Sequence, residues 1–426
     1  MSDTGLMVAG SVDVRNVSIA STSPRSFLQT ITPQVVGIEI YEDIFSPFIS
    51  GKIVVRDSQE LLNLLPLVGE EKIILDIATP TIDEEYTIKG EFFIYKMGDR
   101  IRLSERDTGY QLYFMSKEGI IDINRKISKA YSGNITDIVK KIVVEEDGLS
   151  SKKNLNVETT PTNIKYISNF WSPVQNINYL AQAAINENNS PTYVFFENKF
   201  GLNFISLDSM YDLPVFRQLV WDNYTREITS AGAVKDLNKD WNRIINLNTP
   251  QTFDYIKRIQ SGMYGTEMIM FDIMTKQYTH VGFVPDFSES KHLNKYPMWS
   301  GDAPASTRST LIKEHRYYNN FDGYQDVTNT SHIQKRVSLM TQAEAFKLEV
   351  TVLGRTDYSA GQKINIDVPL NTQIRQETVD PQDKIYSGDY IISAICHKIS
   401  RDSHQCVMEL IKDSFVIDIN TIRHQT

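Results

Sequence analysis

One short alternating pattern occurs twice in the chain, and it constrains the fold more than any other feature. In the later copy, residues 363–368, apolar side chains alternate with Lys363, Asn365 and Asp367. The earlier copy, residues 72–77, keeps a lysine and an aspartate at the same positions. A period of two is typical of a β-strand with one buried and one solvated face. We therefore take ten residues as the candidate positions of a structural repeat: Lys72, Ile73, Leu75, Asp76, Ile77, Lys363, Ile364, Ile366, Asp367 and Val368.

The segments that follow the two copies also agree. A run that begins at Gly90 follows the earlier copy, and a run that begins at Gly388 follows the later one. After a polar turn, each half continues with a third alternating run that starts with glutamine, residues 111–115 and residues 405–408. Three strands in the same order predict that one β unit occurs twice. Chance similarity between short alternating strands is the alternative.

A chain of 426 residues is too long for one ordinary domain. We expect an α+β, mainly β fold with two similar small β-barrels, an α/β domain and an inserted domain. The expected ranges are 1–116 for an N-terminal arm and the first barrel, 117–212 for the α/β domain, 213–249 with 331–417 for the second barrel, 250–330 for the insertion, and 418–426 for a tail. Residues 1 to about 30 are expected to order against a neighbour, and residues 227–234 and 243–248 to open the second barrel.

Two helix starts support the α/β domain. Asn134 precedes apolar residues at helical spacing, which predicts that it caps a helix. Ser172, followed by Pro173 and then by Gln175, has the pattern of a capping box with proline at the first helical position. Residues 193–197 and 202–207 predict a β-hairpin after this second helix.

The formal net charge of −9 argues against a protein that grips nucleic acid, because that work needs clustered lysines and arginines. No apolar run is long enough to span a bilayer, and the first residues lack the basic start of a signal peptide. We expect a protein that is made and kept in a cytoplasm.

The cysteines and histidines give no metal motif. Cys396 and Cys406 lie on the two arms of a predicted hairpin, where one register would place them opposite each other. Two reduced, half-buried thiols are the preferred interpretation, because a reducing compartment disfavours a bridge. His397 and His404 lie on the same hairpin, and we expect both to be polar surface residues. No metal ligand and no cofactor is therefore predicted.

Known catalytic motifs are also absent from the sequence. There is no nucleophile elbow, no P-loop, no dinucleotide fingerprint and no zinc-protease helix. The acidic runs at 84–85 and 145–147 are consecutive, so their side chains do not converge on one substrate, and solvated charge is the better interpretation. The loop from Asp286 to Ala305 mixes aromatic and polar residues, which favours a protein contact over a small-molecule site. We predict no enzymatic activity and no catalytic residue.

Several segments together resemble a known family. They are FKLEVTVLG (346–354), AGQKI (360–364), SGDYII (387–392), ELIKDS (409–414), IYEDIF (40–45) with PLVGEE (66–71), the run 110–133, and WSP (171–173). In their order and spacing they resemble baseplate central hub proteins of contractile-tailed bacteriophages. These hub proteins are related to late control protein D and to the N-terminal half of the type VI secretion spike VgrG. Because the sequence ends soon after the last strand, it is more similar to a separate hub than to a fused spike.

The resemblance implies a homotrimer in the virion, assembled in the host cytoplasm. Three chains with two barrels each would form a ring of six, which joins a trimeric spike to a six-fold tail tube and leaves a channel for DNA. The implied partners are the central spike or tail lysozyme protein, the tail tube protein, the baseplate wedge proteins and the tape measure protein. DNA would pass through without sequence-specific binding, and an acidic channel would let it slide. The alternatives are a cell-wall hydrolase and a carbohydrate-binding adhesin of the tail tip.

Overall fold

The computed structural model describes residues 9–21, 28–64, 67–161, 163–221, 240–251, 254–272, 276–288, 290–299, 309–314, 330–370 and 382–418. The predicted strand at 227–234 and most of the predicted tail lie outside these ranges. No helix within them is long and apolar enough to cross a membrane.

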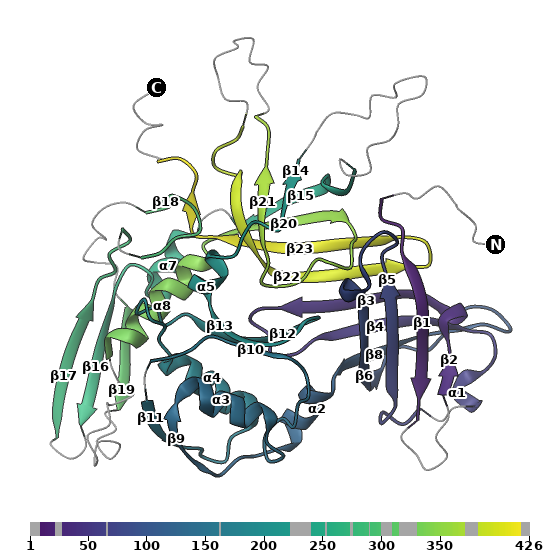
Figure 1. Ribbon diagram of the computed structural model, residues 1–426, viewed down its shortest axis with the longest axis horizontal. Coiled ribbons are helices and arrows are strands. Elements are labelled where there is room, and N and C mark those ends of the chain that lie inside the picture. The colour runs from purple at the N-terminus through teal and green to yellow at the C-terminus, as the bar shows by residue number, and fades with distance from the viewer. Residues whose placement is uncertain are drawn as a thin grey trace, which may run out of the picture.

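A curled sheet of 14 strands dominates the fold (Figure 1) and confirms the predicted mainly β class. Its first half contains β3, β4, β8, β6 and β5 as neighbours, in that order. These strands span Val35–Asp43, Ser50–Asp57, Thr108–Ser116, Ile88–Met97 and Lys72–Ala78. Its second half contains β15, β20, β23, β22 and β21, again as successive neighbours. These span Ile244–Gln251, Phe346–Leu353, His404–Lys412, Gly388–Ser400 and Lys363–Asp367.

Both halves use the same strand order. In each half the first two strands along the chain pair with each other, the fifth inserts next to the second, and the fourth and third follow. We call residues 35–116 the first β unit and residues 244–251 with 346–412 the second β unit. The order is what the repeat in the sequence predicts. The first unit also contains α1 (Leu61–Leu64), η2 (Glu84–Tyr86) and β7 (Ile101–Arg102), which have no counterpart among the described residues of the second unit.

The two β units are joined directly along their edges. The C-terminal part of the long strand β22 pairs antiparallel with β3 of the first unit, from Ala394 opposite Asp43 to Ser400 opposite Gly37. The sheet therefore continues from one unit into the other. In Figure 1, β22 and β23 (yellow) lie beside β3 and β4 (purple) at the centre of the molecule.

The described part of the N-terminal segment is ordered against its own chain, whereas the sequence predicted an arm that orders against a neighbour. Residues Asp13–Ala20 form β1, which pairs antiparallel with β5 of the same chain, and Leu28–Thr30 form β2 beside β1. Val17 and Ile19 of β1 are buried in the first β unit. The alternation in this segment is hidden because β1 is irregular between Val14 and Asn16, where its register with β5 shifts. The short 3₁₀ turn η1 (Thr32–Gln34) then leads into β3.

The α/β part forms a separate layer below the sheet in Figure 1. Its elements are α2 (Lys117–Asn124), β9 (Ala130–Asn134), α3 (Ile135–Val144), β10 (Leu155–Val157), β11 (Asn163–Ile167), α4 (Pro173–Ala183), β12 (Tyr193–Asn198), β13 (Gly201–Ser206) and α5 (Leu207–Tyr211). Both predicted helix caps are confirmed: Asn134 accepts from the backbone of Thr136, and Ser172 and Gln175 form a capping box. The hairpin of β12 and β13 is also confirmed.

The inserted part is a small sheet covered by helices. Strand β16 (Thr266–Asp272) pairs antiparallel with β17 (Gln277–Phe283) and parallel with β19 (Ser309–Glu314). Helix α7 (Tyr255–Ser261) precedes this sheet, and α8 (Thr330–Ala343) leads back into β20. The amide of Gln334 on α8 donates to backbone carbonyls of both β16 and β17. This contact holds the sheet against the helix.

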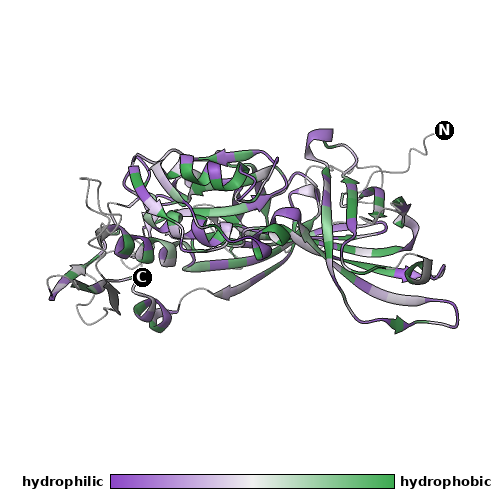
Figure 2. Cartoon of the chain, turned by 90° about the horizontal axis from the view of Figure 1, so that it is seen from below, coloured by the Kyte–Doolittle hydropathy of each residue, from purple (hydrophilic) through white to green (hydrophobic). Residues whose placement is uncertain are grey.

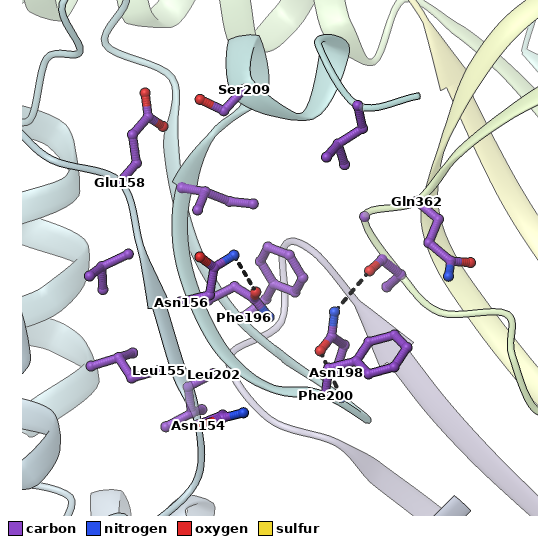
Figure 3. A pocket seen from close by; sticks show the side chains of 16 residues that line it. Asn154, Leu155, Asn156, Glu158, Phe196, Asn198, Phe200, Leu202, Ser209 and Gln362 are labelled. Carbon is purple, nitrogen blue, oxygen red and sulfur yellow. Dashed lines mark hydrogen bonds between the residues drawn. The ribbon is translucent and has the colours of Figure 1, made fainter. Parts of the chain in front are cut away.

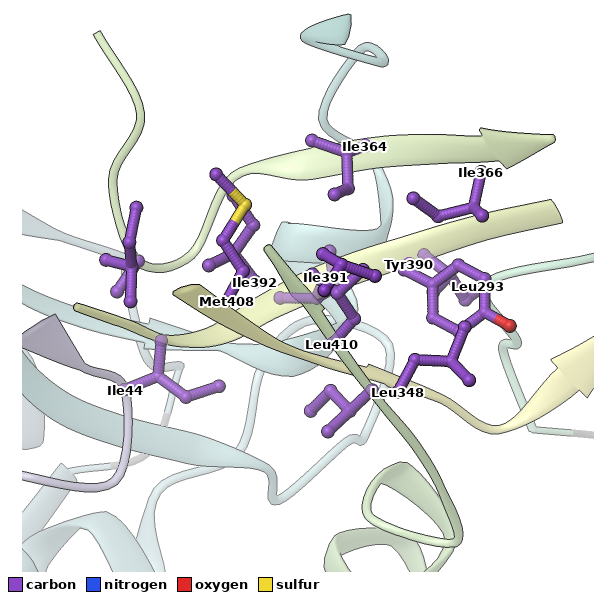
Figure 4. Close-up of a cluster of buried hydrophobic side chains, with 14 of the residues drawn as sticks. Ile44, Leu293, Leu348, Ile364, Ile366, Tyr390, Ile391, Ile392, Met408 and Leu410 are labelled. Carbon is purple, nitrogen blue, oxygen red and sulfur yellow. The ribbon is translucent and has the colours of Figure 1, made fainter. Parts of the chain in front are cut away.

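Four hydrophobic clusters fill the described parts of the chain. The first lies in the first β unit, the second in the second β unit, the third in the α/β part, and a small fourth cluster around Met263 in the insertion. Figure 4 shows the second cluster between β20, β21, β22 and β23. Hydrophilic and hydrophobic colours alternate along the strands in Figure 2. Ile399 of the second unit belongs to the first cluster, and Ile44, which follows β3, belongs to the second, so the two cores share residues at the junction. The predicted domain boundaries therefore stay predictions.

Candidate functional site

The ten candidate positions fall on two corresponding strands. Lys72, Ile73, Leu75, Asp76 and Ile77 lie on β5, Lys363, Ile364, Ile366 and Asp367 lie on β21, and Val368 follows directly. The isoleucines and the leucine among them are buried, and both lysines and both aspartates are half-buried on the other face. This is the alternation that a strand with one solvated face requires. The structure does not bring the two strands together, because each belongs to its own unit.

The partners of these strands repeat as well. Leu75 of β5 lies opposite Gly90 of β6, and Ile366 of β21 lies opposite Gly388 of β22. The pair β5–β6 therefore has the same register as the pair β21–β22, and this is the register that the aligned sequence segments suggest. The register then shifts directly after Ile94 in β6 and directly after Ile392 in β22. A bulge at the same place in both units bends each strand similarly.

The third strands of the two segments, β8 and β23, also correspond, but their residues match differently from the alignment of the two sequence segments. Ile94 lies opposite Phe114 of β8, and Ile392 lies opposite Leu410 of β23. This places Gln111 in correspondence with Val407, two residues away from the predicted match with Gln405. The prediction was wrong because a shift of two residues leaves every side chain on the same face, so alternation cannot detect it.

A buried carboxylate connects three parts of the molecule at the junction of the two units. Glu42 on β3 accepts from the hydroxyl of Ser359 at 2.7 Å, from the amide of Ala360 at 2.9 Å and from the amide of Lys199 at 3.1 Å. Burial raises the pKa of this carboxyl, although the nearby ammonium of Lys199 opposes the shift. Burial also lowers the pKa of Lys199 to about 8, and its Nζ donates to the carbonyl of Thr356. The arrangement fixes β3 against the β12–β13 turn and the segment before β21.

A second ionic group fixes the first unit to the α/β part. Lys153 Nζ lies 2.6 Å from Glu118 Oε2 and also contacts Glu197 Oε1. The other oxygen of Glu197 accepts from the amide of Ile49 in the first unit at 3.2 Å. The two carboxylates keep the pKa of Lys153 raised despite its burial. These groups serve to hold parts of the chain together, because their charges are already paired.

A cavity of about 730 Å³ lies between the α/β part and the second unit (Figure 3). Asn154, Asn156 and Glu158 line one wall, and Gln362, beside the start of β21, lines the other. Asn198 Nδ2 donates across the cavity wall to the carbonyl of Ala360 at 3.3 Å. Glu158 is the one carboxylate among the described lining residues. A paired general acid and base is therefore not present in this lining, and its amide groups suit neutral polar ligands.

The hairpin of β22 and β23 overturns the expectation for its histidines. His397 and His404 are fully buried. Nδ1 of His397 and Nε2 of His404 both contact the thiol of Cys406. The sequence hides this because polar residues continue the alternation where apolar residues are expected. Cys406 lies opposite His397, so Cys396 points elsewhere. Both cysteines are free, as predicted, but only Cys396 is half-buried, whereas Cys406 is fully buried.

The described part of the long loop packs on its own chain. The backbone amide of Leu293 and the ring of His292 both contact the carboxylate of Asp413, and Asn294 exchanges hydrogen bonds with the backbone of Asp389. The strand β18 (Tyr296–Pro297) pairs with β24 (Ser414–Phe415). This segment extends the second unit instead of projecting as a lid.

No protein-family model matches the chain. A probable baseplate hub protein of Vibrio phage KVP40 is 20% identical to it over 409 residues, which are 92% of each sequence.

Solved structures of tail proteins share the fold. A tail protein from Neisseria meningitidis MC58 matches with a TM-score of 0.54 and 13% identity, covering 93% of this chain and 96% of its own. A 43 kDa tail protein of prophage MuSo2 from Shewanella oneidensis matches with a TM-score of 0.54 and 10% identity, covering 94% and 99%. The resemblance expected from the sequence is thus confirmed: the chain is similar to a phage baseplate hub protein over nearly its whole length and has the fold of phage tail proteins.

Proposed function

We propose that the chain is the structural hub of a phage tail baseplate, in which three copies form a ring that joins the central spike to the tail tube. The observation that carries this proposal is the β unit that occurs twice with one strand order and one register. A trimer of such chains presents six similar units, which matches a six-fold tube on one side and a three-fold spike on the other. The protein acts in the virion by shape and contact, without catalysis, and the ring leaves a channel for DNA.

The junction inside one chain suggests how neighbouring chains would join. Within the chain, β22 of the second unit pairs with β3 of the first unit. The corresponding strands are β6 and β15, which do not pair with each other in a single chain. Among the described strands, β5 covers β6 only from residue 88 to 93, and β15 pairs with β20 alone. Uncovered strand edges favour pairing with another chain.

Repeating the same junction between chains closes the ring. We infer that β15 of one chain pairs with β6 of its neighbour in the register seen for β3 and β22. In that register Asn248 of β15 corresponds to Glu39. Counting residues from β6 places Arg100 at the position of Lys398, and the pairing of β7 with β8 places the adjacent Ile101 there. Glu39 and Lys398 lie opposite each other in the chain. Partial burial opposes a lower pKa of Glu39, but the hydroxyl of Tyr41 and the ammonium of Lys52 lower it, and the charge of Lys398 adds to that shift. We therefore infer that Asn248 of one chain lies close to Arg100 of its neighbour.

The pair gives a test with a matched control. Asn248→Arg would place two guanidinium groups close together, whereas Asn248→Glu would place a carboxylate near a guanidinium, similar to the charge pair found inside the chain. Multi-angle light scattering at micromolar concentration should give a trimer for the wild type and Asn248→Glu. It should give monomers for Asn248→Arg, with unchanged circular dichroism. A monomeric wild type that does not assemble when spike protein is added would refute the proposed hub, and equal trimers from both variants would refute the proposed edge.

A further inference from the structure

Three donor atoms of metal-ligand type meet inside the β22–β23 hairpin. His397 Nδ1 lies 3.1 Å from His404 Nε2, and Cys406 Sγ lies 3.3 Å from the former and 3.5 Å from the latter. All three side chains are fully buried. His397 and Cys406 are opposite each other on the two strands, and His404 is two residues before Cys406, on the same face. The register of the hairpin therefore creates the cluster.

Protons alone cannot satisfy the three contacts. An imidazole nitrogen either carries a proton and donates, or lacks it and accepts. If His404 Nε2 donates to His397 Nδ1, that bond uses the single lone pair of the accepting nitrogen, and the thiol of Cys406 donates to the carbonyl of Arg355, so neither contact of the sulfur atom with a ring contains a proton. Any other assignment leaves at least one of the three contacts without a proton. A single cation placed between the atoms would satisfy all three at once.

The dimensions fit such a cation. An ion equidistant from the three atoms would lie roughly 2 Å from each, which is the length of a metal–imidazole bond. A displacement out of the plane and away from the sulfur atom lengthens the bond to sulfur toward its usual value of about 2.3 Å, while the bonds to nitrogen stay near about 2 Å. We propose that His397, His404 and Cys406 form a binding site for one thiophilic transition-metal ion.

The ligand set and the burial favour a monovalent ion. Two imidazoles and a thiolate suit soft or borderline ions such as Cu⁺ and Zn²⁺. Binding would release the thiol proton of Cys406 to solvent and form one metal–sulfur bond and two metal–nitrogen bonds. With Cu⁺ the buried complex is neutral and three ligands are sufficient, whereas Zn²⁺ would leave a buried positive charge and usually takes a fourth ligand. Cu⁺ is therefore the preferred ion.

The surroundings hold the ligands in place. The amide of Gly354 donates to the carbonyl of His404 at 2.7 Å, and the amide of His404 donates to the carbonyl of Gly10 at 2.8 Å. A Cβ at Gly354 would lie 2.2 Å from Cγ of the His404 ring, so only glycine allows this approach. A bound ion would clamp the end of the hairpin at which β22 leaves the second unit to pair with β3. We expect it to strengthen the junction of the two β units.

The test measures metal retention by the full-length protein. Because the ligands are buried, the ion must enter during folding, so the protein is refolded with Cu⁺ under anaerobic reducing conditions, or with Zn²⁺, and excess metal is removed. About one copper per chain is expected for the wild type and for Cys396→Ser, which changes the thiol outside the cluster. Cys406→Ser should retain at least about tenfold less. Retention of zinc alone would support the site and overturn the preference for Cu⁺.

If Cys406→Ser does not fold, a second measurement still tests the proposal. Cys396→Ser protein contains Cys406 as its one remaining thiol, and X-ray absorption of its bound metal should show two nitrogen ligands and one sulfur ligand. The wild-type Tm should also rise on refolding with the metal. Retention of neither metal, equal retention by folded Cys406→Ser, or a metal environment without sulfur would overturn the proposal.

Discussion

The correspondence of Leu75 and Ile366 leads to a quantitative prediction for the two cores. Both side chains are fully buried, Leu75 in the first β unit and Ile366 in the second. Truncation of either to alanine leaves a cavity, which costs about 2–5 kcal/mol of unfolding free energy. Because the residues belong to different clusters, the double variant should cost the sum within about 0.5 kcal/mol. Leu75→Asp and Ile366→Asp bury a carboxylate among apolar side chains and should each prevent folding or ring formation.

Urea denaturation followed by circular dichroism measures these costs. Ile74→Ala and Asn365→Ser are matched controls, because both residues are half-buried on the opposite face of the same strands. Each control should cost about 1 kcal/mol or less. Alanine variants of Leu75 and Ile366 whose costs differ by more than about 3 kcal/mol would exceed the spread expected for one chemistry. That result, or normal trimers from either aspartate variant, would refute the structural equivalence of the two strands.

Three further predictions concern the second unit and the junction. Gly388→Ala should lower the free energy of unfolding by about 1–3 kcal/mol, because the φ of Gly388 is 124° and an added Cβ would lie 2.8 Å from a neighbouring side chain. Gly90→Ala should cost little. Thermal melts compare the two variants. Burial lowers the pKa of Lys412 to about 7. Between about pH 7 and 10.5 the lysine is therefore protonated in the unfolded chain and neutral in the folded one, so stability rises with pH in this range. Urea titrations at several pH values should show a flatter rise for Lys412→Met. Glu42→Gln turns an acceptor into a donor that faces a backbone amide and should cost about 1–3 kcal/mol; an unchanged urea midpoint would show that the buried carboxylate does not hold the junction.

The sequence predicts which face of a strand is buried better than it predicts which residues of the neighbouring strand lie opposite. Alternation correctly assigned the buried residues of β5 and β21, because period two depends on each strand alone. The register of the third strand needed information that alternation lacks, since a shift of two residues preserves the face. The capping residues Asn134 and Ser172 were predictable because their hydrogen bonds are local.

The junction could not be predicted because it depends on contacts between distant segments. Glu42 is one acidic residue in an alternating strand, and nothing near it in sequence indicates that Ser359 and Lys199 surround it. His397 and His404 look like solvated residues until the hairpin register places them inside. Both groups form where β3 meets β22, at the contact that the repeat alone does not reveal.

An end-on electron microscopy image of the assembled protein tests the central claim most directly. Three chains, each with two β units of one strand order, should give a closed ring with six similar lobes and a central hole. A ring with three lobes, or particles of single chains at micromolar concentration in the presence of spike protein, would contradict the account.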